Sequence, residues 1–242
     1  MSLNELELNM LVKTKCDDYV IYTKGKGEDY KRVFADFIHN RLTVEKVFRN
    51  IEDTKVVLVN FESKLYVLKV FKPKEKQLER FLKSFIKGDY YLNLMKKTDE
   101  LWSKGVQFQN DFYLLAEKKI FNYASLFIML IEYIPGQELS LYHTVPEELK
   151  KEIVSIISCL HENGMVSGDP HKGNFIISDN VLRLIDLSGK KINKMRIAKN
   201  YIDLERHLGI NGFHKGFFYH WVKKKSQFRK RFKAFKLALK GK

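Results

Sequence analysis

Asp169, Asn174 and Asp186 are the residues of this 242-residue chain whose types and spacing point most directly to a reaction. Asp169 and Asn174 lie in the polar segment 167–174, and Asp186 follows twelve residues after Asn174. Phosphoryl transfer from ATP requires a carboxylate that orients the attacking hydroxyl and further oxygen ligands that hold magnesium against the phosphates. The three side chains supply such a set, so the sequence predicts an ATP-dependent phosphotransferase that requires Mg2+.

The donor atoms favour magnesium over zinc. Magnesium prefers hard oxygen donors and keeps few protein ligands, whereas a zinc site calls for more His or Cys. The chain has two cysteines, Cys16 and Cys159, which lie far apart and lack CxxC spacing. A thiol-bound zinc site and a disulfide framework are therefore not expected.

The elements around segment 167–174 favour a catalytic loop over the alternative, a surface turn opened by Asp169-Pro170. A capping-box sequence at residues 144–147 predicts the start of a helix, and Gly164 stands where its C-terminal cap belongs. Beyond the segment, two short apolar runs enclose the turn sequence Ser178-Asp179-Asn180, which predicts a hairpin. A helix, a polar loop, a hairpin and a later Asp in this order supply the context that such a motif requires.

The first half of the chain predicts a sheet. A helical region at 75–97 separates β-branched and aromatic runs that predict antiparallel strands and end at Pro135-Gly136. The pattern indicates an α+β fold in two lobes, with an N-terminal antiparallel sheet lobe at residues 1–134 and a mainly helical lobe at residues 135–242. The predicted strands are 44–48, 56–59, 65–71, 116–120 and 126–134.

The charge of the chain implies an anionic partner. Lys and Arg number 44 against 29 Asp and Glu, a formal charge of +15, which suits nucleic acid, acidic lipid or a phosphorylated glycan. Residues 223–242 carry ten basic residues and an apolar stripe with helical spacing, which is typical of an interfacial or docking helix. The stripe consists of Phe228, Phe232, Phe235 and Leu239.

The distribution of apolar residues predicts a cytoplasmic protein. No stretch approaches the roughly 20 apolar residues that span a bilayer, and residues 1–10 lack the basic-then-apolar layout of a signal peptide. Hydrophobic residues make up 45% of the chain, which is enough for a sizeable core.

The motif GDPHKGN, followed by IDL, resembles the catalytic loop of the protein-kinase-like superfamily, in which Asp stands five residues before Asn and a second Asp follows a hairpin. It is more similar to sugar and antibiotic kinases with HGDxHxGN than to protein kinases with HRDxKxxN and DFG. The resemblance implies a bilobal protein-kinase-like fold with Asp169 as catalytic base and with Asn174 and Asp186 as magnesium ligands. Ser167 departs from the pattern, because those families usually have His there.

Lys69 resembles the third-strand lysine that pairs with the ATP phosphates in this superfamily. Strand alternation places Lys69 on one face with Val67 and Phe71, and a lysine on an otherwise apolar face needs a partner. A lysine on an amphipathic strand is otherwise more often solvated. The acidic residue of the following helix that would pair with Lys69 is Asp89, with Glu79 as the alternative.

Segment 129–136 resembles the hinge of these kinases, whose backbone groups bind adenine. The corresponding residues here are Glu132, Tyr133 and Ile134, and a buried strand leaving the sheet is a compatible interpretation. Residues 49–55 occupy the place of the glycine-rich phosphate loop but contain no Gly, which leaves Thr54 and Lys55 as candidates for phosphate contacts.

Several longer stretches, from about residue 15 to the end, resemble the bacterial lipopolysaccharide core heptose(II) kinase family. This resemblance implies transfer of the γ-phosphoryl group of ATP to a hydroxyl of the second heptose, on the lipid A-anchored core oligosaccharide. The stretches are 83–91, 110–113, 116–125, 167–174, 185–190 and 205–210.

Two questions stay open at this level. The C-terminal helix either contacts an anionic membrane surface, peripherally at the cytoplasmic face of the inner membrane, or packs its stripe against the helical lobe. The acceptor is alternatively another small molecule, sugar or protein. A non-catalytic basic module that binds membrane or nucleic acid would also explain the charge, but the complete set of Lys69, Asp169, Asn174 and Asp186 argues against it, so no nucleic-acid partner is expected.

Overall fold

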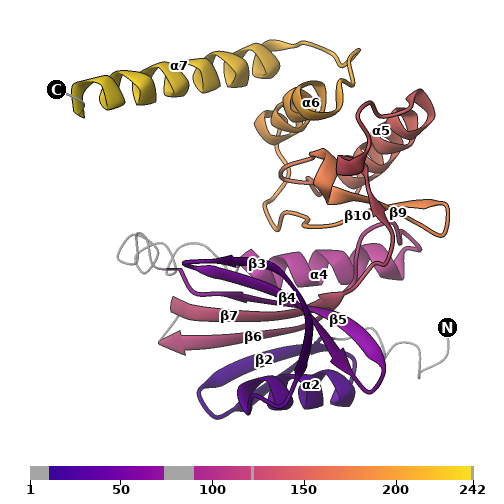
Figure 1. The fold of residues 1–242 in the computed structure, drawn as a ribbon. Helices are drawn as coiled ribbons and strands as arrows, with labels where there is room; N and C mark the ends of the chain where they lie inside the picture. Colours follow the sequence, from indigo (N-terminus) through magenta and orange to yellow (C-terminus); the bar gives the residue numbers. More distant parts are fainter. Residues whose placement is uncertain (1–10, 74–89, 121–122, 241–242) are drawn as a thin grey trace. The chain divides into compact units, whose positions relative to one another are not determined.

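The computed structural model describes residues 11–73, 90–120 and 123–240, and the chain divides into two compact units, Met1–Pro135 and Gly136–Lys242 (Figure 1). A sheet dominates the first unit, and helices dominate the second. The expected α+β class is confirmed, with the antiparallel sheet in the N-terminal unit.

Within the described ranges, the sheet of the first unit has seven antiparallel strands in the order β1-β2-β6-β7-β5-β4-β3. The five predicted strands are all present, and the sequence analysis missed the β1–β2 hairpin that extends the sheet beyond β6. The strands are β1 (Leu11–Cys16), β2 (Tyr19–Lys24), β3 (Thr43–Ile51), β4 (Thr54–Phe61), β5 (Lys64–Phe71), β6 (Phe112–Ile120) and β7 (Tyr123–Glu132).

Alternation along the strands gives the sheet two apolar faces, each covered by one described helix. Helix α2 (Glu28–Ile38) packs through Val33 and Phe34 on the face that contains Leu68. Helix α4 (Tyr90–Ser103) packs through Met95 on the other face, which contains Met129 (Figure 1). The helix expected over 75–97 is confirmed from Tyr90 onward, and residues 74–89 lie outside the described part of the chain.

The second unit places a small sheet among helices. Its described strands run in the order β10-β9-β8, and Asp179 and Asn180 form the tip of the predicted hairpin with left-handed φ values of 50° and 62°. The elements are β8 (Gln137–Glu138), η1 (Leu139–Leu141), α5 (Glu147–Glu162), η2 (Lys172–Asn174), β9 (Phe175–Ser178), β10 (Val181–Leu184), α6 (Lys194–Leu208) and α7 (Phe217–Lys240).

Helix α5 does not begin with the expected capping box. Its N-cap is Pro146, which has extended backbone and makes no side-chain cap hydrogen bond. The non-helical ψ of 149° at Pro146 places the helix start at Glu147, and Val145, which is 2% exposed, is buried in the core just before it. Acidic Glu147 and Glu148 in the first turn complement the helix dipole instead. The predicted C-terminal glycine is confirmed, since Gly164 has a φ of 72° directly after the helix.

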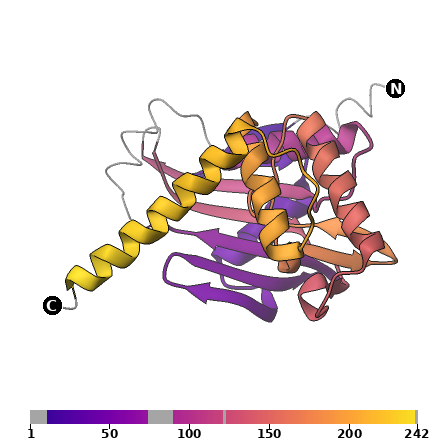
Figure 2. The same ribbon diagram turned by 90° about the horizontal axis from the view of Figure 1, so that it is seen from above.

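Helix α7 is longer than the predicted basic helix and begins at Phe217. Its first turns pack on α6 through Tyr219 and Val222, which contact Ala198 and Ile202, and the helix then runs past α6 (Figure 2). No helix among the described residues combines the length and apolarity needed to cross a bilayer.

Candidate active site

The predicted catalytic segment folds back on itself and brings Asp169 and Asn174 together. The Asn174 side-chain amide donates to the backbone oxygen of Asp169 over 2.8 Å. Gly173 donates its backbone N–H to His171 Nδ1 over 3.1 Å, which caps the short helix η2. Asn174 Oδ1 makes no hydrogen bond with any described residue, so the amide oxygen remains available as a ligand.

The segment that carries Asp186 lies beside this loop. Ile185 donates its N–H to the Asn174 oxygen over 2.9 Å, and an isolated antiparallel bridge joins Val166 to Ser188. Asp186 itself has a φ of 58°, a conformation that residues other than glycine seldom adopt and that concentrates at functional sites. The structure therefore brings the neighbourhoods of all three predicted chemical residues together within the second unit.

Of the motif residues Lys172 and Ser167, only Lys172 braces the loop through its side chain. Lys172 Nζ donates to the backbone oxygens of Tyr142 and His143 at 2.9 and 2.8 Å, which ties η2 to the chain that precedes α5. Ser167, which replaces the usual His, is 2% exposed, and its Oγ has no hydrogen-bond partner among the described residues. Ser167 therefore fills a buried position without a side-chain hydrogen bond to the described residues.

Helix α6 contributes residues that the sequence analysis missed. Lys199 Nζ donates to the Gly168 oxygen at 3.0 Å and also pairs with Asp203, which is 4% exposed. One carboxylate oxygen each from Asp169 and Asp203 and one ring nitrogen of His207 lie within 4.8 Å of one another. The only sequence signal was that positions 199, 203 and 207 are spaced four residues apart and therefore share one helix face. Such spacing is common in helices.

Helix α6 is fixed at both ends and along its length. The Asn193 side chain accepts the Arg196 N–H at 2.9 Å, and Gly209 ends the helix in a left-handed conformation. His161 of α5 contacts the buried Asn200 through a 3.1 Å Nε2–Oδ1 hydrogen bond. Burial lowers the pKa of His161, so this hydrogen bond is made by a neutral imidazole at neutral pH.

In the first unit, Lys69 lies in β5 directly opposite Met129 of β7 and Val56 of β4. Residues opposite each other on antiparallel strands share a face, so Lys69 lies on the apolar face that α4 covers, as the alternation predicted. Both proposed partners, Asp89 and Glu79, lie outside the described residues.

The predicted hinge follows the end of β7. Glu132 Oε2 accepts the Asp111 N–H at 2.9 Å, and the Glu132 N–H donates to the Asp111 oxygen at 2.9 Å. This pair ties the exit of β7 to the start of β6. Tyr133 stacks on Phe48 of β3 with ring centroids 6.4 Å apart, and Ile134 is 4% exposed. The Glu132 carboxylate thus stabilises the strand end.

A further contact links this region to the α4 side of the sheet. Lys24 Nζ lies 2.9 Å from Asp111 Oδ1 and 3.3 Å from Asp99 Oδ1 of α4, over the ring of Trp102. Burial raises the pKa of Asp99, although Lys24 opposes that shift. Lys24 therefore joins β2 to α4 and to Asp111, and Asp111 in turn contacts the end of β7.

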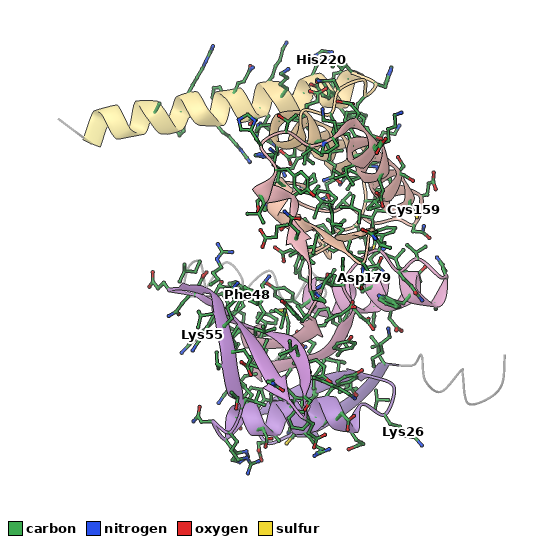
Figure 3. All side chains as sticks on the ribbon, turned by 45° about the vertical axis from the view of Figure 1, so that its right-hand side comes forward. Lys26, Phe48, Lys55, Cys159, Asp179 and His220 are labelled. Atoms are coloured by element: carbon green, nitrogen blue, oxygen red, sulfur yellow. The ribbon has the colours of Figure 1, made fainter. Side chains whose placement is uncertain are left out.

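Residues 49–55, which occupy the expected place of the glycine-rich phosphate loop, form the turn between β3 and β4 together with the adjoining strand ends. Thr54 Oγ1 donates to Asp53 Oδ1 at 3.0 Å, and Lys55 is exposed at the start of β4. Figure 3 shows Phe48 and Lys55 on this hairpin. Phe48 is 45% exposed on the edge strand. The turn residues Glu52 and Asp53 are not among those with a left-handed φ, so this turn does not require glycine.

Comparison with known proteins places the chain among close relatives. A family model described as lipopolysaccharide core biosynthesis protein (WaaY) matches residues 10–242. An Escherichia coli protein named lipopolysaccharide core heptose(II) kinase WaaY is 47% identical over 227 residues, covering 94% of this chain and 99% of the relative. A protein of the same name from Escherichia coli strain K12 is 44% identical over 233 residues, covering 96% and 99%.

Among solved structures, two crystal structures of the Mycobacterium tuberculosis PknI kinase domain are 15% identical to this chain. One has a TM-score of 0.39 and covers 60% of this chain and 59% of that chain. The other has a TM-score of 0.43 and covers 72% and 76%. The family model and the Escherichia coli relatives, by contrast, extend over nearly the whole sequence, and the chain belongs to the lipopolysaccharide core biosynthesis protein (WaaY) family.

Proposed function

We propose that this protein is a kinase that transfers the γ-phosphoryl group of ATP to a hydroxyl of the second heptose of the lipopolysaccharide inner core. The observation that carries the proposal is the near-full-length similarity to two Escherichia coli proteins named heptose(II) kinase. The paired Asp169 and Asn174 supply the chemistry that such a reaction needs.

The oxygen donors of the second unit suit a bound Mg2+. Asn174 offers Oδ1, and Asp186 offers a carboxylate in the adjacent segment that hydrogen-bonds to the Asn174 backbone. We assign these two residues as its ligands. When bound, the ion would neutralise the negative charge of the ATP phosphates.

Asp169 has the properties of the catalytic base. Its carboxylate is exposed, and it makes no hydrogen bond or ion pair with any described residue. It accepts the proton of the acceptor hydroxyl while a bond forms between that oxygen and the γ-phosphorus. The bond between the γ-phosphorus and the bridging oxygen of ATP breaks, and ADP leaves.

We assign the ATP contacts of the first unit to two regions. Lys69, which lies in β5 on the sheet face that α4 covers, would pair with the phosphates, as the third-strand lysine of the protein-kinase-like superfamily does. The backbone of Glu132, Tyr133 and Ile134 would bind adenine. The acidic partner of Lys69, Asp89 or Glu79, remains a prediction from the sequence.

The function is tested by mass spectrometry of core oligosaccharide incubated with the protein, ATP and Mg2+. The expected product gains one phosphate, which fragmentation places on the second heptose. An oligosaccharide truncated after the first heptose is the matched control and should gain none. Phosphorylation of the truncated acceptor, or no phosphate on the complete one, would show that the assignment of the acceptor is wrong.

The proposal includes peripheral docking of α7 on an anionic membrane surface, at the cytoplasmic face of the inner membrane. Phe217, Trp221 and Phe228 are 72%, 52% and 69% exposed. At 100° per residue these three lie on one face of the helix, opposite Tyr219 and Val222, which pack on α6. This aromatic face of α7, formed by Phe217, Trp221 and Phe228, is therefore not the face that packs on α6.

Cations flank this stripe. Lys224 and Lys225 are exposed and fall on its two sides, and no acidic residue follows Glu205 in the chain. An aromatic stripe with cationic flanks suits the interface of an anionic bilayer, where the rings enter the headgroup region and lysines attract lipid phosphates. Phe228 also belongs to the stripe predicted from the sequence, and it is 69% exposed. Its exposure argues against the alternative in which the predicted stripe packs against the helical unit.

We expect the double variant Lys224→Ala/Lys225→Ala to bind vesicles containing phosphatidylglycerol about 30-fold more weakly than the wild type, since each lysine near such a surface contributes about 1 kcal/mol. Co-sedimentation measures the affinity. Leu141→Ser, which alters a 72% exposed leucine of the same unit, is the control and should bind normally. Equal binding to vesicles of phosphatidylcholine alone, or unchanged binding by the double variant, would contradict membrane docking.

A further inference from the structure

The carboxylate of Asp169 has two neighbours on helix α6, and only one of them is accessible. Asp203 is 4% exposed, pairs with Lys199 and lies 3.7 Å from Arg206. Its charge is therefore already compensated. His207 is exposed, and among the described residues it makes a ring contact with His171 but no hydrogen bond or ion pair. Asp169 and His207 are thus the two members of the cluster that can meet an incoming molecule.

The spacing between them suits one bridging oxygen atom. The ring nitrogen of His207 and a carboxylate oxygen of Asp169 lie within 4.8 Å, yet no hydrogen bond joins them. An oxygen that makes hydrogen bonds of about 2.7 Å to both, at a near-tetrahedral angle, sets its two partners about 4.4 Å apart. A hydroxyl is chemically suited to this position, because it donates to a carboxylate and accepts from an imidazole N–H.

We infer that His207 is a positioning residue for the acceptor, holding the attacking sugar hydroxyl against Asp169. The inference rests on the proposed function and extends it by naming a residue that contacts the acceptor. The hydroxyl proton points at Asp169, one oxygen lone pair accepts from His207, and another remains for the γ-phosphorus. The His207 proton is not transferred in this step.

Positioning of a reacting group requires a rigid support, and α6 has contacts that supply one. Lys199 joins α6 to the Gly168 oxygen, one residue before Asp169. The partly buried hydrogen bond between His161 and Asn200 joins α6 to α5. The helix that carries His207 is therefore fixed both to the catalytic loop and to the element that precedes it.

The test measures the affinity for the acceptor and the KM for the nucleotide separately, in the wild type and in His207→Ala. Calorimetry with deacylated core oligosaccharide and no nucleotide should show about tenfold weaker binding by the variant, the effect expected for one lost hydrogen bond. The KM for the oligosaccharide should rise in parallel, while the KM for ATP stays within twofold. His207→Asn and His207→Gln place an amide N–H near Nδ1 and Nε2 respectively, and one of them should recover most of the affinity.

The control is His214→Ala, which removes another exposed imidazole of the same unit and should leave all values unchanged. Normal oligosaccharide binding by His207→Ala overturns the inference. So does an equal loss of ATP affinity, a changed Mg2+ requirement, or a loss that neither amide variant recovers, since each points to a nucleotide-side, metal-binding or purely structural role. If the wild type adds no phosphate to the oligosaccharide, the proposed function fails instead.

Discussion

Asp169→Asn is expected to lower kcat for heptose phosphorylation by about 10²–10⁴-fold, the usual contribution of a general base. Asparagine has nearly the same shape but does not accept the hydroxyl proton. The Asp169 side chain makes no hydrogen bond or ion pair with a described residue, and Asn174 contacts its backbone oxygen, which the substitution retains. The loss should therefore fall on turnover, with little change in KM for ATP or in thermal stability.

The matched control is Asp179→Asn at the tip of the β9–β10 hairpin (Figure 3). Asp179 is also an exposed aspartate, and its left-handed φ of 50° is one that asparagine tolerates. Steady-state kinetics should show wild-type turnover for this variant. If Asp169→Asn kept more than half of the wild-type kcat, Asp169 would not be the base.

Gly168→Ala is expected to lower the free energy of unfolding by about 2–5 kcal/mol, combining backbone strain with overpacking. Gly168 has a φ of 90°, and a Cβ added there would lie 2.7 Å from the Ser188 Cβ. The clash would separate the catalytic loop from the segment that follows Asp186. Heptose phosphorylation should fall with stability, because Asp169 and Asp186 flank the contact.

The variant Gly212→Ala separates the effect of backbone strain from the effect of overpacking. Gly212 lies in the same unit with a φ of 99°, and an added Cβ would have no atom within 4 Å, so this variant carries the backbone strain alone. Urea unfolding should show a loss of about 1–2 kcal/mol for it. Adding Ser188→Gly to Gly168→Ala removes the clashing Cβ and should recover part of the lost stability. Equal losses for Gly168→Ala and Gly212→Ala would mean that the contact with Ser188 is unimportant.

Local patterns in the sequence predicted most of the elements. Strand alternation gave the five strands from β3 to β7 and the face of Lys69, and the Ser178-Asp179-Asn180 turn gave the hairpin. These signals depend only on neighbouring residues. The predicted capping box is absent because the N-cap is Pro146, whose side chain has no oxygen to accept a hydrogen bond, so the motif at residues 144–147 lies two residues too early. The β1–β2 hairpin was missed, although its strands alternate weakly.

The predicted site residues rest on two different kinds of sequence signal. Asp169, Asn174 and Asp186 were recognisable because the chain order of their motif is itself the signal, and the structure adds the contacts between Asn174 and both neighbouring segments. The roles assigned to Lys69 and to Glu132, Tyr133 and Ile134 rest on resemblance together with their positions in the first unit.

By itself, the sequence determined the α+β plan and the basic C-terminal helix, and it predicted the phosphotransfer loop, since each depends on residue type and short-range spacing. Only the tertiary structure decided which distant residues surround Asp169. Asp203 and His207 reach it because α6 packs on α5 through Asn200 and holds the Gly168 oxygen through Lys199. Packing between helices brings together residues whose separation along the chain carries no pattern, and so the face of α6 that meets the loop is set by the fold.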